Sequence, residues 1–422
     1  MKENAMAGRV KRLERGDAIP AWLPLLLGAL TAVGPVSTDV YLPAMPQMEH
    51  ELHGAPGSGS LTMAAWVLGL AIGQISMGPL SDRFGRKLPL LVGMAGYTIG
   101  EIGCALSTDM TVMCVWRVFA AIMASAGLVV PNACIRDLTV GDASSRLMSR
   151  LTVIQGAVPI LAPMLGGLAL HYVDWRMIFW ATVVFGAVCT VLVAVCFPET
   201  LSPSLRGDLR PDLLVRRYGA ILRSPSFTSH ALIWGCLGIV TFTYLSAAPE
   251  LFEGRFGMNP AHYGMLFGLF AVGSIGASAV NGALVGRVRG ARLMMGALIC
   301  ALIGCGASLA IGLAAEHGAV AGAYPAVLLV PMIAALFFSL APVGIAGPNA
   351  MATALSAQEG QAGSAAALAG TIQYICGASA SALFGLCAHW VGVSLALFLL
   401  GAYAVAAILA LWGHRAQKGQ VS

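Results

Sequence analysis

Apolar runs of about twenty residues recur along the whole chain, and no other feature limits the possible folds as strongly. A run of this length lets an α-helix cross the hydrocarbon core of a bilayer, where each backbone polar group must be hydrogen-bonded within the segment. Charged residues make up only 10% of the 422 residues, whereas about 25% is usual in soluble domains. The sequence therefore predicts an all-α membrane protein and excludes an ordinary soluble domain.

We expect twelve transmembrane helices arranged as two six-helix bundles. The predicted spans are 20–44, 60–80, 88–107, 110–134, 148–170, 176–197, 228–249, 262–285, 292–314, 323–347, 362–387 and 391–413. The longest polar interval, 198–227, divides them six and six, and is expected to be a cytoplasmic linker with an amphipathic helix near 212–223. The two bundles are then 20–197 and 228–413, between cytoplasmic tails at 1–19 and 414–422.

The basic residues predict the orientation of the chain, because Lys and Arg accumulate on the cytoplasmic side of membrane proteins. With the N-terminus in the cytoplasm, most of the 24 Lys and Arg fall in cytoplasmic segments, and the outer loops keep Arg176 and Arg255. We therefore expect a multi-pass protein of the cell inner membrane with both termini cytoplasmic.

Short matches in the same order relate the two halves of the chain. VYLPAMP at 40–46 matches TYLSAAP at 243–249, and GPLSDRFGRKLPLL at 78–91 matches GALVGRVRGARLMM at 282–295. Further along, Gln155 corresponds to Gln373. Such an internal duplication predicts pseudo-symmetric bundles with a binding site near the membrane midplane, as in many secondary transporters.

The most specific motif lies between the second and third spans. Its residues are Gly78, Asp82, Arg83, Gly85, Arg86 and Lys87. These residues predict a glycine-containing turn with three cations and one acid. Their spacing is more specific than the positive-inside bias alone requires. An ordinary basic loop is the alternative interpretation.

This segment resembles the signature loop of the major facilitator superfamily. LTMAAWVLGLAIGQISMGPLSDRFGRK, STDVYLPAMPQM, CIRDL and FPETL further resemble its bicyclomycin/chloramphenicol-resistance (Bcr/CflA) group of drug–proton antiporters. The resemblance covers nearly the whole chain and implies the major facilitator fold.

The resemblance also implies roles for the loop residues. Gly78 would pack closely against the eleventh span, and Asp82 would lie near the N-terminus of that helix. Arg86 would pair with Asp137 at the end of the fourth span. Such a cluster would lock the outward-open state and break on inward opening.

Asp39, Glu101 and Arg117 are charges within predicted spans, all in the first half. A charge costs at least about 2.5–3.5 kcal/mol inside a bilayer, so it usually has a function. Asp39 occupies the acid position of the group's D-x-Y-L-P-A-x-P motif, and we favour a proton carrier over a structural ion pair. Arg117 either adjusts the proton affinity of a nearby acid or extends to the outer surface. Glu101 is equally well a second proton site, the partner of Arg117 or a water-exposed residue.

Pro159, Pro163, Gly166 and Gly167 resemble the motif that distinguishes exporters from importers in the superfamily, although Ala162 replaces a usual glycine. Prolines remove helix hydrogen bonds and glycines allow close approach, so we expect this span to bend against its neighbour. Prolines and glycines are also common in membrane helices generally, so the motif alone favours export only weakly.

Polar and aromatic residues within spans are candidates for lining a substrate cavity, or equally for contacts between helices. They are Tyr41, Trp66, Asn132, Gln155, Tyr244, Gln373 and Tyr374. Gln155 and Gln373 are slightly favoured because they hold equivalent positions in the two halves.

The leading hypothesis is a multidrug transporter, acting as a monomer, that exports small, mostly apolar compounds in exchange for protons. A facilitator or importer of a sugar or organic acid is the alternative, and a membrane-embedded enzyme or receptor is a remote one. We find no cofactor or metal motif, no phosphate-binding loop and no nucleic-acid signature. We therefore expect protons, a small molecule and the lipid bilayer as partners, and no enzymatic activity.

Overall fold

The computed structural model describes residues 22–55, 57–138, 142–202, 206, 211–320, 322–356, 358, 361–386 and 390–419. The first half contains α1 Leu23–Asp39, η1 Leu42–Ala44, α2 Met45–Glu51, α3 Gly59–Phe84, α4 Lys87–Ala105, α5 Met110–Leu138, α6 Asp142–Ala169 and α7 Trp175–Val195. After α8 Pro211–Leu222, the second half contains α9 Pro225–Pro249, η3 Glu250–Arg255, α10 Pro260–Leu284, α11 Gly290–His317, η4 Ala326–Leu328, α12 Leu329–Leu340, α13 Val343–Ser356, α14 Ala362–Leu386 and α15 Val391–Gly419.

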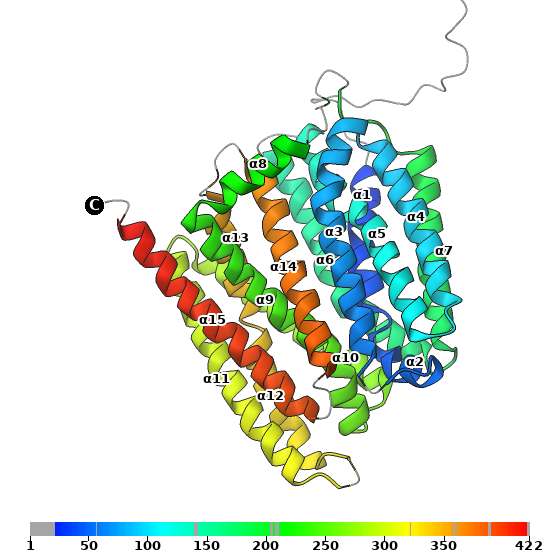
Figure 1. Cartoon of the computed structure of the whole chain (residues 1–422), viewed down its shortest axis with the longest axis vertical. Helices are drawn as coiled ribbons and strands as arrows, with labels where there is room; N and C mark the ends of the chain where they lie inside the picture. The colour runs from blue at the N-terminus through cyan, green and yellow to red at the C-terminus, as the bar shows by residue number, and fades with distance from the viewer. Residues whose placement is uncertain are drawn as a thin grey trace, which may run out of the picture.

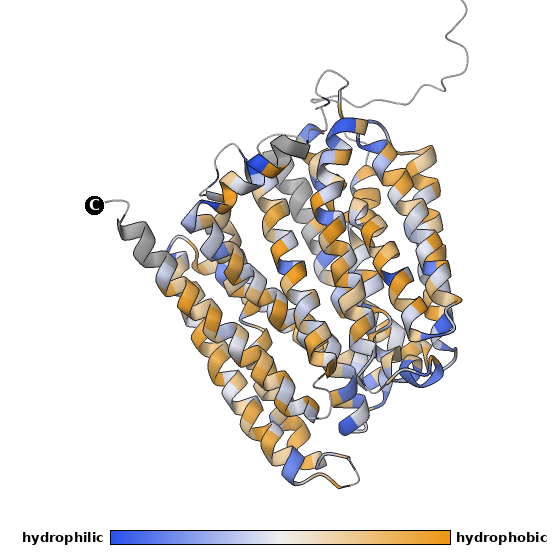
Figure 2. Ribbon diagram, in the orientation of Figure 1, coloured by the Kyte–Doolittle hydropathy of each residue, from blue (hydrophilic) through white to orange (hydrophobic). Residues whose placement is uncertain are grey.

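The described chain confirms the all-α membrane fold. Eleven helical segments are long and apolar enough to cross a bilayer. A twelfth is α6, whose described apolar part is Gln155–Ala169. Figure 1 shows the two bundles side by side, with α8 at one end, here called the α8 end, and α2 at the other, here called the α2 end. Hydrophobic residues cover the middle of the helices in Figure 2, and hydrophilic residues gather at both ends.

The first span is interrupted next to Asp39. The α-helix ends at Asp39, and the chain continues through a short turn into η1 and α2. Pro43 and Pro46 lack the N–H needed for regular helical hydrogen bonds, which explains why the continuation is short and irregular. Asp39 therefore lies at a break in the helix rather than within a continuous span.

Two other predicted spans differ from the structure. The seventh continues beyond Pro249 as the π-helical turn η3, so Glu250 and Glu253 extend the helix. The tenth was predicted at 323–347 but runs from Ala326 to Ser356, with a break between α12 and α13 that contains Pro342. The prediction ended this span near Pro348, which instead lies inside α13.

Close packing around α6 depends on glycines, both within the first bundle and across the bundle interface to α10. A Cβ atom on Gly166 would lie 1.9 Å from the Val40 carbonyl oxygen, and one on Gly167 would lie 2.2 Å from the Pro260 carbonyl oxygen. On α10, a Cβ on Gly264 would lie 2.5 Å from the Pro163 carbonyl oxygen. These glycines therefore let backbone approach backbone, in agreement with the close approach predicted for the motif.

We expect Gly166→Ala to lower the free energy of unfolding by about 1–3 kcal/mol, because its methyl group would overlap the Val40 carbonyl. Gly306→Ala on α11 is the matched control, since a Cβ there meets nothing within 4 Å. That control should be neutral or stabilising, because Ala favours a helix over Gly. Thermal unfolding of the purified variants measures both, and equal melting temperatures would contradict this packing.

Candidate functional site

Arg117 of α5 is fully buried in the first bundle. Its guanidinium lies 4.2 Å from the ring of Trp66 and 4.4 Å from the ring of Tyr41, with Phe179 at 5.9 Å. Its Nη2 donates a 3.0 Å hydrogen bond to the carbonyl oxygen of Ser37, in the last turn of α1. Cation–π contacts are strongest away from water, so these rings help to offset the cost of burying the charge. The interpretation that Arg117 extends to the surface is wrong.

Glu101 of α4 is the ionic partner of Arg117. Its Oε1 lies 3.8 Å from Arg117 Nη1, and both side chains are fully buried. The other carboxylate oxygen accepts a 2.8 Å hydrogen bond from the Thr182 hydroxyl of α7. The interpretation of Glu101 as a water-exposed residue is therefore wrong, and the pairing with Arg117 is present.

This ion pair is incompletely hydrogen-bonded. Glu101 Oε1 and the Nε and Nη1 atoms of Arg117 are buried without a hydrogen-bond partner among the described residues. Buried charges are stable only when their remaining donors and acceptors are satisfied, so this cluster has unused hydrogen-bonding capacity. The guanidinium can therefore donate a hydrogen bond to a further acceptor without breaking an existing one.

Asp39 is nearly buried at the end of α1 and forms no ion pair or hydrogen bond within the described chain. It lines a cavity of about 190 Å³, whose remaining walls come mostly from the second bundle. The ring of Tyr244 lies 5.4 Å from Phe270 and 6.0 Å from Phe267, all three in the cavity wall. The Tyr244 hydroxyl is buried without a partner among the described residues. Asp39 thus faces an apolar, aromatic cavity instead of a structural counter-charge.

The other predicted cavity residues do not line this cavity. Tyr41 and Trp66 hold Arg117 within the first bundle. Asn132 donates a 3.0 Å hydrogen bond to Leu128 of its own helix. The remaining three are Gln155, which is half-buried on α6, Gln373, which packs against Gly238, and Tyr374, which contacts the ring of Phe242. From the exporter-like motif, Pro159 does contribute to the cavity wall.

A second charged cluster lies at the α8 end. Arg86 Nε donates a 2.8 Å hydrogen bond to Asp137 Oδ2, and Arg86 Nη1 donates a 2.6 Å hydrogen bond to Asp82 Oδ1. Burial acts to lower the pKa of Arg86, but the charges and hydrogen bonds of Asp137 and Asp82 hold that pKa above its ordinary value. The predicted pair of Arg86 and Asp137 is present, and its arginine stays charged.

Glu199 belongs to this cluster, although sequence reasoning did not select it. Its Oε1 accepts hydrogen bonds from the backbone N–H of Arg86 at 2.9 Å and of Leu201 at 3.0 Å. Gly85 adopts a positive φ of 88°, and a Cβ there would lie 2.3 Å from Glu199 Oε2. Glycine is therefore required for the turn and for the approach of this acid. Glu199 belongs to the FPETL segment, which served only as a family resemblance and not to select this residue.

The other loop residues include one whose predicted role is wrong. Gly78 was expected to pack against α14, but a Cβ on it would meet no described atom within 4 Å. A close approach on the same helix is made by Gly73, toward Ser125 of α5. The side chains of Arg83 and Lys87 form no ion pair within the described chain, and Arg83 lies over the ring of Phe84. Proximity of Asp82 to the N-terminus of α14 stays a prediction.

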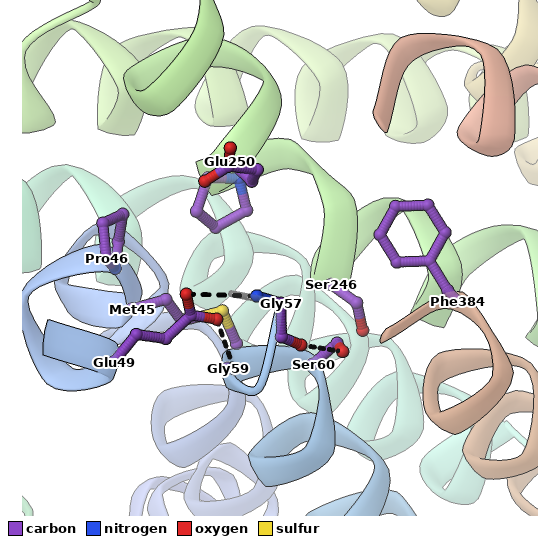
Figure 3. Close-up of a pocket in the computed structure, with 10 residues that line it drawn as sticks. Met45, Pro46, Glu49, Gly57, Gly59, Ser60, Ser246, Glu250 and Phe384 are labelled. Atoms are coloured by element: carbon purple, nitrogen blue, oxygen red, sulfur yellow. Dashed lines mark hydrogen bonds between the residues drawn. The ribbon is translucent and has the colours of Figure 1, made fainter. Parts of the chain in front are cut away.

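The two bundles meet at the α2 end (Figure 3). Glu49 of α2 accepts hydrogen bonds from the N–H groups of Gly57 and Gly59, while Ser246 and Glu250 line the same small pocket from the second bundle. The hydrogen bonds of Arg86 to Asp82 and Asp137 at the α8 end are formed in this same structure. The role of these contacts as a lock of the outward-open state stays a prediction.

Residues 27–381 match the family model of the Major Facilitator Superfamily. The chain belongs to the major facilitator superfamily. Members of this superfamily are transporters of small molecules, not enzymes.

Relatives and solved structures agree with this assignment. An uncharacterized MFS-type transporter YdgK of Bacillus subtilis is 31% identical over 86% of this chain and 88% of its own. A bicyclomycin resistance protein homolog of Haemophilus influenzae is 26% identical over 92% of this chain and 94% of its own. The crystal structure of a D-xylose-proton symporter superposes with a TM-score of 0.71 at 16% identity, covering 93% of this chain and 96% of the other. That last likeness shows the fold.

We expect Arg117→Gln or Glu101→Gln alone to destabilise the protein by about 3–5 kcal/mol, because each leaves a buried charge without its partner. The double variant should recover a large part of this loss. Thermal unfolding of the three variants in one detergent measures the coupling. If the two single losses simply add in the double variant, the pair is not an interacting unit.

We expect Glu199→Ala to destabilise the turn by about 1–3 kcal/mol for each buried N–H left unpaired, those of Arg86 and Leu201. Glu199→Gln is the control, because both N–H groups donate to Oε1, and the amide oxygen of Gln can accept both hydrogen bonds without the charge. The melting temperature should fall clearly for Glu199→Ala and less for Glu199→Gln. Equal falls would show that charge, rather than hydrogen bonding, is the contribution of Glu199.

Proposed function

We propose that this transporter exports small, mostly apolar compounds in exchange for protons, by alternating access across the inner membrane. The observation that carries the proposal is the position of Asp39, a nearly buried acid without a partner in the described chain, on the wall of an aromatic cavity. An ionised carboxylate is costly in such surroundings, and binding a proton removes that cost. Asp39 is therefore the proton carrier of the proposal.

Arg117 gives the carrier a fixed positive neighbour. It holds the carbonyl of Ser37, two residues before Asp39, and arginine keeps its charge under all working conditions. Its Nε and Nη1 atoms donate no hydrogen bond within the described chain, so they can donate to a carboxylate that has lost its proton. We propose that Asp39 turns toward Arg117 after releasing its proton and away from it after binding one, with Glu101 holding the arginine throughout.

The cavity wall favours apolar cargo over a sugar. Its hydroxyl groups are those of Thr241, Tyr244 and Ser274, and most of the other lining residues are hydrophobic. A site for a sugar needs several aligned donors and acceptors, since unpaired hydroxyls are expensive to bury. The resemblance to a bicyclomycin resistance homolog also supports export of drug-like compounds.

The basic residues support an orientation with the α8 end in the cytoplasm. Arg83, Arg86 and Lys87 lie at this end, as do Arg216 and Arg217 of the exposed helix α8. Both termini would then be cytoplasmic, and a single copy of the chain contains the complete proposed pathway.

We expect Asp39→Asn to abolish uphill transport, because the amide cannot release a proton. The assay is accumulation of ethidium or chloramphenicol in proteoliposomes with an acidic interior. The wild type should concentrate the probe, and the variant should only equilibrate it. Gradient-independent exchange of the same probe should survive, which separates loss of coupling from loss of folding.

Asp174→Asn is the matched control, since Asp174 is an exposed acid at the start of α7 in the same half. This variant should accumulate the probe like the wild type. Full uphill accumulation by Asp39→Asn would contradict the proposed carrier. Equilibration by the wild type itself, regardless of the pH gradient, would favour a facilitator.

A further inference from the structure

The second half carries an altered copy of the charged loop. In the duplication, GALVGRVRGARLMM at 282–295 corresponds to GPLSDRFGRKLPLL at 78–91, so Gly286 stands opposite Asp82. The copy keeps three cations, Arg287, Arg289 and Arg292, and contains no acid. All three arginines are exposed and form no ion pair within the described chain. In the first copy Arg86 pairs with two carboxylates, those of Asp82 and Asp137, whereas no cation of the second copy has such a partner in the described chain, which leaves all three available for an external anion.

A groove begins directly beside these arginines. It has a volume of about 450 Å³ and lies between α10, α11 and the break that separates α12 from α13. Among the described residues that line it, Arg292 is the one with a charge, and it lies in the first turn of α11. Gly296 and Cys300 follow on the same face at intervals of one turn. Phe337 and Phe338 line it from α12. The groove is therefore apolar along its length and cationic at its α8 end.

The protein itself leaves this groove unfilled. A Cβ on Gly296 would meet nothing within 4 Å, so there is room for added atoms. Phe338 is 56% exposed, and Ile299 and Ile303 on the neighbouring face of α11 are 51% and 70% exposed. Figure 1 places α11 at the edge of the second bundle, away from α3 and the first bundle. The groove thus opens toward the bilayer and is separate from the cavity beside Asp39.

We propose that this groove binds an anionic phospholipid of the leaflet at the α8 end. One acyl chain would lie along α11 against Gly296 and Phe338, and the phosphate would contact Arg292, with Arg287 and Arg289 adding to the positive potential. Basic residues beside an apolar recess between membrane helices are suited to acidic headgroups. A free phosphate ion would satisfy the arginines but leave the apolar groove without an occupant, so the lipid explains both features.

The test measures lipid retained by the purified full-length protein, using fluorescent phosphatidylglycerol and, in parallel, fluorescent phosphatidylcholine in detergent micelles. Arg292→Gln should weaken binding of phosphatidylglycerol roughly fivefold, as expected for one cation near a membrane surface. It should leave the weaker binding of phosphatidylcholine unchanged. Gly296→Leu, which fills the groove, should weaken binding of both lipids.

Two matched controls keep the result specific. Arg216→Gln removes one exposed arginine from α8, and Gly306→Leu adds the same side chain to α11 where a Cβ also meets nothing within 4 Å. Both should bind lipid like the wild type, and thermal unfolding checks that all four variants are folded.

Three results would overturn the proposal. The first is wild-type binding of phosphatidylglycerol by both Arg292→Gln and Gly296→Leu. The second is a loss in Arg292→Gln with none in Gly296→Leu, which would assign the arginines to a headgroup or ion without the groove. The third is complete displacement of phosphatidylglycerol by millimolar inorganic phosphate, which would make a free anion the ligand.

Discussion

The buried guanidinium of Arg117 connects the helices of the first bundle that surround the proposed proton site. It contacts the end of α1 through Ser37, α3 through Trp66, α4 through Glu101 and α7 through Phe179. An uncompensated charge at this depth would cost several kcal/mol, so all these contacts must form together for the bundle to be stable. Arg117 therefore ties the last turn of α1, and the backbone beside Asp39, to the other helices of the bundle.

Equivalent positions in the two halves of the duplication have different surroundings. Tyr41 and Tyr244 occupy corresponding positions in VYLPAMP and TYLSAAP. In the first half the tyrosine ring faces Arg117, whereas in the second half it packs with Phe267 and Phe270 in the cavity wall. The same scaffold position thus contributes to a charged network in one bundle and to the wall of an aromatic cavity in the other.

Much of the fold can be predicted from the sequence, because the length of each apolar run and the charge of each loop can be judged without knowing the rest of the structure. The interruptions do not follow so simply: Pro348 lies within a helix, whereas Pro342 lies at a break. Within the site, the intramembrane charges were identifiable from the cost of burying them. The aromatic partners were harder to predict, because Phe267 resembles any lipid-facing phenylalanine until the packing of α10 is known. Likewise, Glu199 lies beyond the sixth span, and its approach to Gly85 depends on the tertiary fold.

Substrate-induced proton release from the purified transporter tests the central claim most directly. Ethidium or chloramphenicol is added to the protein in weakly buffered detergent solution, and a pH indicator records the change. The wild type should release protons on binding, whereas Asp39→Asn should bind the probe without releasing any. Equal proton release by both proteins would contradict the assignment of Asp39 as the carrier.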